Sequence, residues 1–197
     1  TTSIIDTTND RGSAAGAGIT LGGAVDGSAA NTQSLTMNAG TGGAIAASST
    51  IGTGTSVKTL TVTNSGGATF TGAVSTGTDV VLSNTTGSIE FTGALTTPTL
   101  TTAAQGYNLK LLGNGTAITN AFTATNTGTL QLGDAAGDIL TFTGGLTATA
   151  PSGVTLNGQV RTAGQAVSLG DSDTAVTLAG TTSIIDTTND RGSAAGA

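Results

Sequence analysis

Short apolar segments recur along the chain, and apolar and polar residues alternate within each of them. Alternation that is rich in β-branched residues is typical of β-strands. Most of the segments end at Gly, Asn or Asp, which tolerate the backbone conformation of a sharp corner. The pattern therefore predicts short strands joined by tight corners, at residues 19–23, 35–40, 60–64, 80–84, 109–114, 130–134, 154–158 and 175–180.

The eight segments recur with a mean period of about 22 residues, which is in the range of solenoids and propellers. This period is too short for a four-stranded propeller blade, but it fits one coil of a parallel β-helix. We expect an all-β fold, a right-handed parallel β-helix (β-solenoid) with about eight coils per 180 residues, because parallel crossovers are right-handed. The alignment that gives this period uses one apolar residue of each segment, namely Leu21, Met37, Val62, Leu82, Leu111, Leu132, Leu156 and Leu178.

A second strand follows the first one in several coils. The phrases ATFTGAV at 68–74 and IEFTGAL at 89–95 place Phe70 and Phe91 at equivalent positions, and LTFTGGL at 140–146 has the same shape. Thr-, Gly- and Ser-rich stretches return the chain to the next coil. The longest of these returns, 48–57 and 96–107, are expected to be protruding loops.

The first seventeen residues, TTSIIDTTNDRGSAAGA, recur without change at 181–197. This repetition predicts one β-solenoid repeat unit at 1–180 and the start of the next identical unit at 181–197. No charged cluster or amphipathic helix is expected to cap the first or last coil. We therefore expect self-association, with adjacent units stacked end to end through these two segments. The sequence leaves open a covalent tandem array and a non-covalent polymer.

The composition suits a solenoid with a thin core. Glycine accounts for 32 of the 197 residues, aromatic residues for 3% and charged residues for 8%. One coil of this composition cannot bury its own apolar residues, so stacking against neighbouring coils is needed. The net charge of −6 argues against nucleic acid as a partner. No run of 18 apolar residues is present, so membrane insertion is not expected.

The residues needed for most catalytic chemistry are missing or dispersed. The chain has no His and no Cys, which excludes a Ser-His-Asp triad and a Cys nucleophile. The basic residues Lys58, Lys110, Arg11 and Arg161 are expected to fall on different coils. We interpret the carboxylate pair Asp134 and Asp138 as turn residues, and we expect no enzyme, catalytic residue or cofactor.

Two acidic stretches carry the oxygen ligands that calcium prefers. They contain Asp6, Asn9 and Asp10 in DTTND, and Asp171 and Asp173 in GDSD. Neither stretch matches an EF-hand loop or a calcium-binding β-roll repeat. We therefore expect corner residues and no metal site, although bound calcium stays an alternative.

Alternating threonines suggest a further alternative. Thr-x-Thr pairs at 59–63, 69–71 and 141–143 could form the flat array that some ice-binding proteins use. The uneven coil lengths favour ordinary outward-facing threonines of high β-propensity.

The phrases LTVTNSGGATFTGAV at 60–74 and VVLSNTTGSIEFTGAL at 80–95 resemble the β-helical repeats of large bacterial surface proteins. Autotransporter passengers and filamentous-haemagglutinin-like adhesins belong to this group. The resemblance implies secretion, a cell-surface or extracellular location and an extended rod. We expect a structural role in an extracellular fibre or stalk. An adhesin that binds a glycan or host surface through its longer loops is the alternative, followed by an ice-binding or polysaccharide-acting β-helix.

Overall fold

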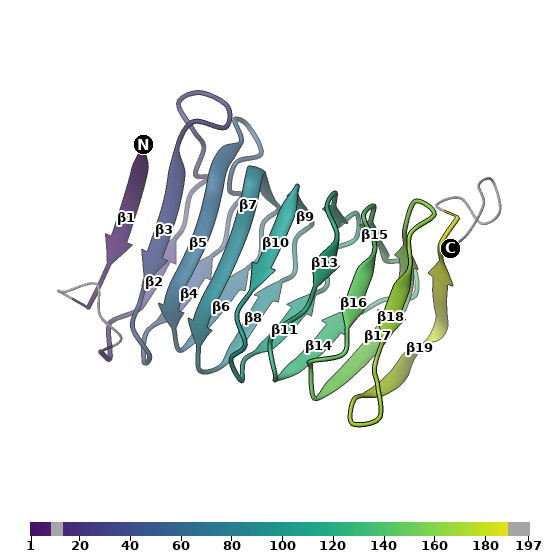
Figure 1. Ribbon diagram of the computed structural model, residues 1–197. Helices are drawn as coiled ribbons and strands as arrows, with labels where there is room; N and C mark the ends of the chain where they lie inside the picture. The colour runs from purple at the N-terminus through teal and green to yellow at the C-terminus, as the bar shows by residue number, and fades with distance from the viewer. Residues whose placement is uncertain (9–13, 189–197) are drawn as a thin grey trace.

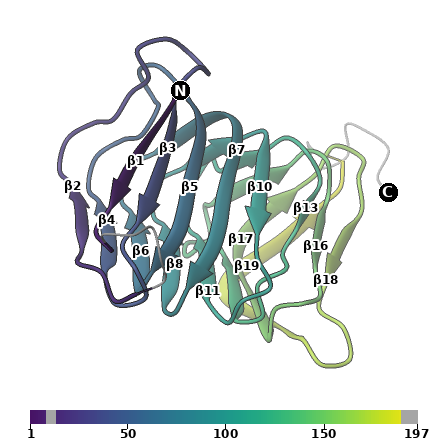
Figure 2. The same cartoon turned by 60° about the vertical axis from the view of Figure 1, so that its left-hand side comes forward.

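The computed structural model describes residues 1–8 and 14–188, and every regular element in this part of the chain is a β-strand. It contains nineteen strands, and the pairs between them are parallel. The chain winds around one core, so that each strand lies beside its counterparts in neighbouring coils (Figures 1 and 2). The expected all-β solenoid of about eight coils is confirmed.

The first face of the solenoid is the row of strands nearest the viewer in Figure 1. Strand pairing joins the first five members of this row. Between the fifth and the sixth member, Thr102 Oγ1 lies 2.9 Å from Thr125 Oγ1. The row consists of β1 (Thr2–Asp6), β3 (Ser34–Asn38), β5 (Val57–Ser65), the second part of β7 (Val74–Thr85), β10 (Thr99–Thr102), β13 (Phe122–Thr123), β16 (Leu146–Ala148) and β18 (Val167–Leu169).

The second face is the most regular one, because all eight coils contribute a strand to it. Strand pairing runs through the whole row without interruption. The row consists of β2 (Ile19–Leu21), β4 (Ala44–Ala47), β6 (Gly67–Phe70), β8 (Ser88–Phe91), β11 (Asn108–Leu111), β14 (Thr129–Leu132) and the first parts of β17 (Gly153–Arg161) and β19 (Ala175–Asp186).

The third face is narrow at the N-terminal end and wider towards the C-terminal end. It starts with single bridges that join Val25 to Ile51 and Ile51 to Val74. It continues through the first part of β7, β9 (Leu95–Thr97), β12 (Ala117–Ile118), β15 (Ile139–Phe142) and the second parts of β17 and β19.

Alternate residues of each strand point into the core, and the register between paired strands stacks these residues in rows. In β8, for example, Ile89 and Phe91 are fully buried while the residues beside them are half-buried. Such rows bury apolar side chains that a single coil would leave in water. The inward row at the end of the second-face strands is Leu21, Ala47, Phe70, Phe91, Leu111, Leu132, Leu156 and Leu178.

The eight residues that the sequence pattern aligned do not all lie on one face. Leu21 and the four residues from Leu111 onward belong to the second face, whereas Met37, Val62 and Leu82 stack on the first face. The alignment was therefore wrong between Leu21 and Met37 and between Leu82 and Leu111. Both faces carry the same alternation of apolar and polar residues, so the alternation alone does not distinguish them.

The phrase Phe-Thr-Gly is used on two faces. Phe70 and Phe91 are opposite each other on the second face, and their rings stack with centroids 4.7 Å apart. The predicted equivalence of these two residues is confirmed. Phe142 instead lies on the third face, where it is paired with Ile118, and its ring stacks on Phe122 at 5.9 Å.

The glycine of this phrase is required by the close approach of successive coils. A Cβ atom added at Gly93 would overlap the backbone of Gly72, and one at Gly113 would overlap the backbone of Gly93. Only a hydrogen atom fits at this corner, so the glycines stack one above another.

The Gly93→Ala variant is expected to lose about 1–3 kcal/mol of unfolding free energy, because its methyl group overpacks the corner. Urea denaturation followed by circular dichroism measures this loss. Gly22→Ala is the matched control, since nothing lies within 4 Å of a Cβ atom at that position. Equal effects of the two substitutions would show that the glycine stack is not tightly packed.

The return at 48–57 partly fits its predicted role as a loop. Ile51 and Gly52 are buried, and Ile51 belongs to the third face, whereas residues 53–56 stand away from the coils. They lie beside the connection between β2 and β3, residues 22–33, at the top of Figure 1. Asp26 Oδ1 accepts the N–H groups of Gly54 and Thr55 at 3.0 and 3.2 Å, which ties the two segments together.

The stretch 96–107 is not a protruding loop, and this prediction was wrong. It contains most of β9 and all of β10. Thr97 and Thr102 are buried, and Thr97 Oγ1 lies 2.6 Å from the buried Thr76 Oγ1. A hydroxyl that finds a partner can enter the core, so a threonine-rich stretch is not necessarily exposed.

A ladder of polar side chains runs along the corner where the first-face strands end. Asn84 Nδ2 donates to Asn64 Oδ1 at 2.9 Å, and Asn64 Nδ2 donates to Asn38 Oδ1 at 3.1 Å. Asn38 Nδ2 then donates to Asp6 Oδ2 at 3.3 Å. Asn64 and Asn38 each donate and accept in this ladder, and the carboxylate, which only accepts, ends the series. The ladder fixes the register of four coils.

Candidate functional site

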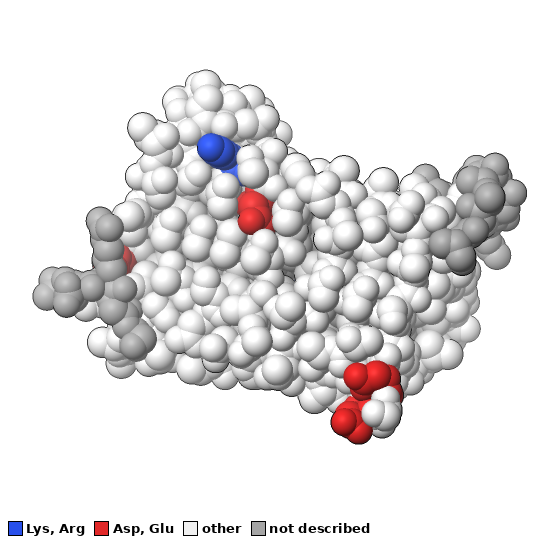
Figure 3. Space-filling model, viewed as in Figure 1, with Lys and Arg blue, Asp and Glu red and all other residues white. Residues whose placement is uncertain are grey.

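Charged side chains are sparse on the surface: on the face in view in Figure 3, a basic group lies near an acidic group, and a small acidic patch lies at the lower right. The described cations lie on three different faces: Lys58 on β5, Lys110 on β11 and Arg161 on β17. Lys110 forms an ion pair with Glu90 at 3.2 Å. Arg11 lies outside the described residues. The structure therefore does not bring the described cations together into a basic groove.

The carboxylate pair at 134 and 138 forms a turn. Asp138 Oδ2 accepts the backbone N–H groups of Asp134 and Ala135 at 2.9 and 2.8 Å. Partial burial and the neighbouring Asp138 carboxyl raise the pKa of Asp134. Asp138 thus has the predicted role of a turn residue.

The first calcium candidate is only partly described. Asn9 and Asp10 lie outside the described residues. Asp6 Oδ1 accepts both the N–H and the hydroxyl of Thr8 at 2.7 Å, while its Oδ2 accepts from Asn38. These contacts make Asp6 the start of a tight turn and the end of the polar ladder.

The second calcium candidate is also a turn. Asp171 Oδ1 accepts the N–H groups of Asp173 and Thr174, each at 2.9 Å. Within residues 1–8 and 14–188, no three His, Cys, Asp or Glu side chains lie close enough together to hold a metal ion.

The threonine pairs do not form a continuous array. Thr141 and Thr143 follow the third face, Thr69 has Glu90 as its neighbour on the second, and the longest series lies on the first. There Asp79 stands between Thr59 and Thr99, and burial raises the pKa of this carboxyl. The adjacent row is also interrupted, and it reads Thr36, Thr61, Val81 and Thr101.

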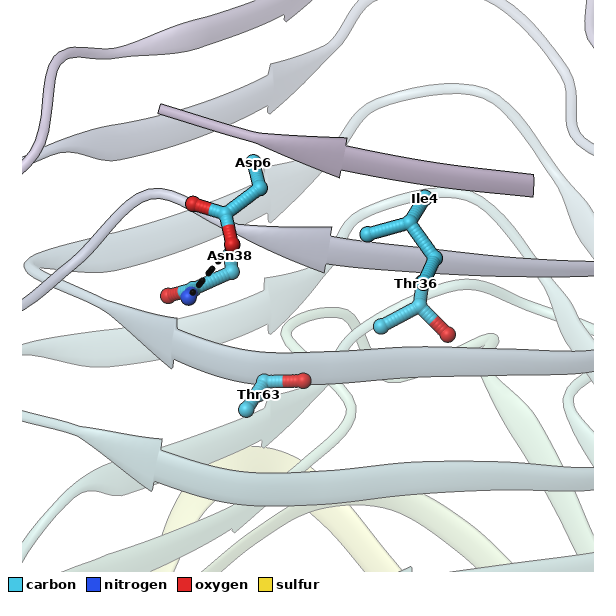
Figure 4. Close-up of a pocket in the computed structure, with 5 residues that line it drawn as sticks. All are labelled: Ile4, Asp6, Thr36, Asn38 and Thr63. Atoms are coloured by element: carbon cyan, nitrogen blue, oxygen red, sulfur yellow. Dashed lines mark hydrogen bonds between the residues drawn. The ribbon is translucent and has the colours of Figure 1, made fainter. Parts of the chain in front are cut away.

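One hollow of about 200 Å³ lies near the N-terminal end of the first face (Figure 4). It is lined by Ile4, Asp6, Thr36, Asn38 and Thr63, and Thr63 is the extra residue of a β-bulge. Asp6 and Asn38 bond to each other across it. Pockets for drug-sized ligands are larger, about 300–1,000 Å³. The hollow therefore does not have the size of a developed ligand pocket.

The C-terminal end of the solenoid has an open core. Val176, Leu178 and Ile185 are exposed by 41%, 65% and 49%, although each belongs to an inward-facing row. Among the described strands, β19 pairs with β17 alone, so its other edge has no strand neighbour. The counterparts of these three side chains in the preceding coil are buried: Val154, Leu156 and Val160.

The N-terminal end is open to a smaller degree. Ile5, Leu21 and Val25 face inward but are only half-buried, whereas Ile19 is buried. Among the described strands, β1 pairs with β3 alone and β2 with β4 alone. Both ends thus combine apolar side chains with unpaired strand edges, a combination that promotes pairing with another chain.

The sequence predicts uncapped ends, but it does not identify the polar ladder or the exposed apolar side chains of the end coils. For the ladder, a signal was present: the segments LTMN, LTVTN and VVLSN each end in an asparagine. Their common ending identifies them as successive strands of one face. The exposed side chains at the ends could not be identified without the correct assignment of faces.

Comparisons add no relative to this description. No protein-family model, no curated protein and no solved structure matches the chain. The part of the chain that the structure describes contains no helix able to cross a membrane. The chain is therefore classified by its architecture alone, as a parallel β-solenoid of about eight coils.

Proposed function

We propose that this chain is a structural unit of an extracellular fibre or stalk, in which β-solenoid units join end to end. The exposed inward-facing side chains of the last coil carry the proposal. In a monomer they leave apolar surface in water beside an unpaired strand edge. A second solenoid stacked on this end would cover both.

The expected gain is large enough to drive association. Full burial of a Val, Leu or Ile side chain contributes about 1.5–3 kcal/mol. Three such side chains lie at the C-terminal end and three half-buried ones at the N-terminal end. Hydrogen bonds of the two free edges would extend the parallel ladder across the joint. The loss of translational and rotational freedom opposes these gains, so association should depend on concentration.

The outer surface suits a passive rod. It carries few charges, and its described acidic and basic side chains mostly serve turns, strand register or a single ion pair. The resemblance of residues 60–95 to repeats of bacterial surface proteins supports an extracellular or cell-surface location. An adhesin-type protein or an autotransporter passenger fits this proposal.

The paired loops 22–33 and 53–56 favour adhesion as the second candidate function. They project from the solenoid and are held together by Asp26 and by a 2.6 Å bond from Ser56 Oγ to Asn31 Oδ1. A glycan or host surface would contact this protrusion. Binding on a glycan array that disappears when loop residues are replaced would establish this role.

Sedimentation velocity over a wide concentration range tests the structural function. The expected result is a rising mean mass and a frictional ratio that increases, as for a lengthening rod. Negative-stain images of the same samples should show unbranched filaments. A constant mass of 18.7 kDa at all concentrations would contradict the proposal.

A further inference from the structure

The two ends of the described solenoid are incomplete coils that complement each other. At the C-terminal end, β19 supplies a second-face part, Ala175–Leu178, and a third-face part, Ser183–Asp186. No residue up to Thr188 continues this coil onto the first face. At the N-terminal end the situation is reversed. There β1 lies on the first face, ahead of the first second-face strand β2 (Figures 1 and 2).

The two copies of the repeated segment occupy these different places. Thr2–Asp6 lies on β3 of the first face, whereas Ser183–Asp186 lies on β17 of the third face. Their local conformation is nevertheless the same. Asp6 Oδ1 accepts the N–H and hydroxyl of Thr8, and Asp186 Oδ1 accepts those of Thr188 at 2.9 and 2.6 Å. The segment is therefore one local structure that fits two positions of the coil.

We propose that copies of this chain join head to tail by building one shared coil. In this coil β19 of one copy supplies the second and third faces, and β1 of the second copy supplies the first face. The inference rests on the proposed end-to-end function and specifies its joint. The two repeated segments then lie side by side in the same coil, on different faces, and not one above the other.

Continuation of the rows defines the contacts of this joint. On the second face, Val176 and Leu178 would stack on Ile19 and Leu21 of the second copy. Within one chain, Val176 and Leu178 already stack in the same way on Val154 and Leu156. These apolar side chains of one end thus meet apolar side chains of the other, whereas the half-buried Val167 of the first face would meet Ser3, which begins its row.

The remaining two faces follow in the same way. On the third face Ile185 continues the row that begins at Val25. On the first face Leu169 would meet Ile5 of the second copy, because both belong to the row that contains Met37 and Leu82. Leu169 and Ile5 are half-buried in the single chain.

Direct stacking of the two repeated segments is the competing arrangement. It would place the third-face part of β19 on the first-face strand β1, so the second-face rows would no longer be continuous. It would also bring the carboxylates of Asp186 and Asp6 into adjacent coils, about 4.8 Å apart. Like charges at this distance disfavour each other's ionisation. The shared coil avoids this repulsion.

Cysteine cross-linking of the full chain distinguishes the two joints, because the natural sequence has no cysteine. Thr177 and Thr20 face outward on the second face and become neighbours in the shared coil. A chain carrying both Thr177→Cys and Thr20→Cys should give a ladder of disulfide-linked oligomers under mild oxidation. Adjacent parallel strands have the Cα separation that a disulfide requires.

Two further double variants serve as controls. Thr155→Cys with Thr20→Cys should give no ladder, since Thr155 lies one coil further inside. Ile184→Cys with Ile4→Cys reports direct stacking of the repeated segments. A ladder from this pair alone would overturn the shared coil but leave end-to-end assembly intact. If no pair gives a ladder and the protein sediments as a single chain, both the joint and the proposed function are wrong.

Discussion

The Leu178→Lys variant is expected to weaken end-to-end association by at least about 100-fold and to leave the single solenoid folded. Leu178 is 65% exposed in the single chain, so its replacement removes little buried surface from the fold. In a joint the lysine ammonium would have to leave water and enter an apolar row, which costs several kcal/mol. Each 1.4 kcal/mol corresponds to about tenfold in affinity.

Thr69→Lys is the matched control for this variant. It adds the same charge to an outward-facing position of the second face, two coils inside the N-terminal end and far from the C-terminal end. Sedimentation should show normal association for Thr69→Lys and only single chains for Leu178→Lys, while circular dichroism shows the same β-sheet content in both. Unchanged association of Leu178→Lys would mean that the C-terminal end is not part of a joint.

The Phe91→Ala variant is expected to lose about 3–5 kcal/mol of unfolding free energy. Phe91 is fully buried in the middle of the second-face row, and its ring stacks on that of Phe70 at an interplanar angle of 10°. Truncation removes the stacking and leaves a cavity that the neighbouring coils cannot fill. Because domains are stable by only about 5–15 kcal/mol, the loss should be evident as a large shift of the urea midpoint.

Phe91→Leu separates the loss of volume from the loss of an aromatic ring. It keeps most of the apolar side chain and should cost less than half as much as Phe91→Ala. Both measurements are best made in the Leu178→Lys background, where association does not add to stability. A cost below about 1 kcal/mol for Phe91→Ala would contradict the tight stacking of the second-face row.

The fold class could be predicted because it depends on repetition. Alternating segments at intervals of about 22 residues are compatible with few architectures, and the eight coils agree with that interval. The equivalence of Phe70 and Phe91 could also be predicted, because whole phrases recur around them. These features depend on local sequence, which is visible without the fold.

The assignment of strands to faces could not be predicted, because it depends on distant coils. Met37 resembles Leu21 in its local sequence, yet the two residues face the core from different sides. Thr97 resembles a loop residue, but a hydroxyl of another coil satisfies it in the core. In both cases the deciding partner lies about twenty residues away and becomes visible only when the coils are stacked.

The faces that the two repeated segments occupy at the candidate joint could not be predicted either. The identity of Thr1–Asp6 with Thr181–Asp186 predicts that the two segments are related. It does not predict that one copy lies on the first face and the other on the third. The sequence of the segment is the same in both places, so it cannot decide which strand the segment pairs with. The free strand edge of the neighbouring coil decides it.

Fibre diffraction from aligned, concentrated protein tests most directly whether the coils continue from one copy into the next. Continuous stacking of the coils predicts a sharp axial reflection near 4.8 Å, the spacing of paired strands, together with an axial repeat of roughly 38 Å for eight coils. Both reflections should weaken in Leu178→Lys samples prepared in the same way. Isotropic scattering from independent particles of the unsubstituted chain would show that the coils do not continue from one copy into the next.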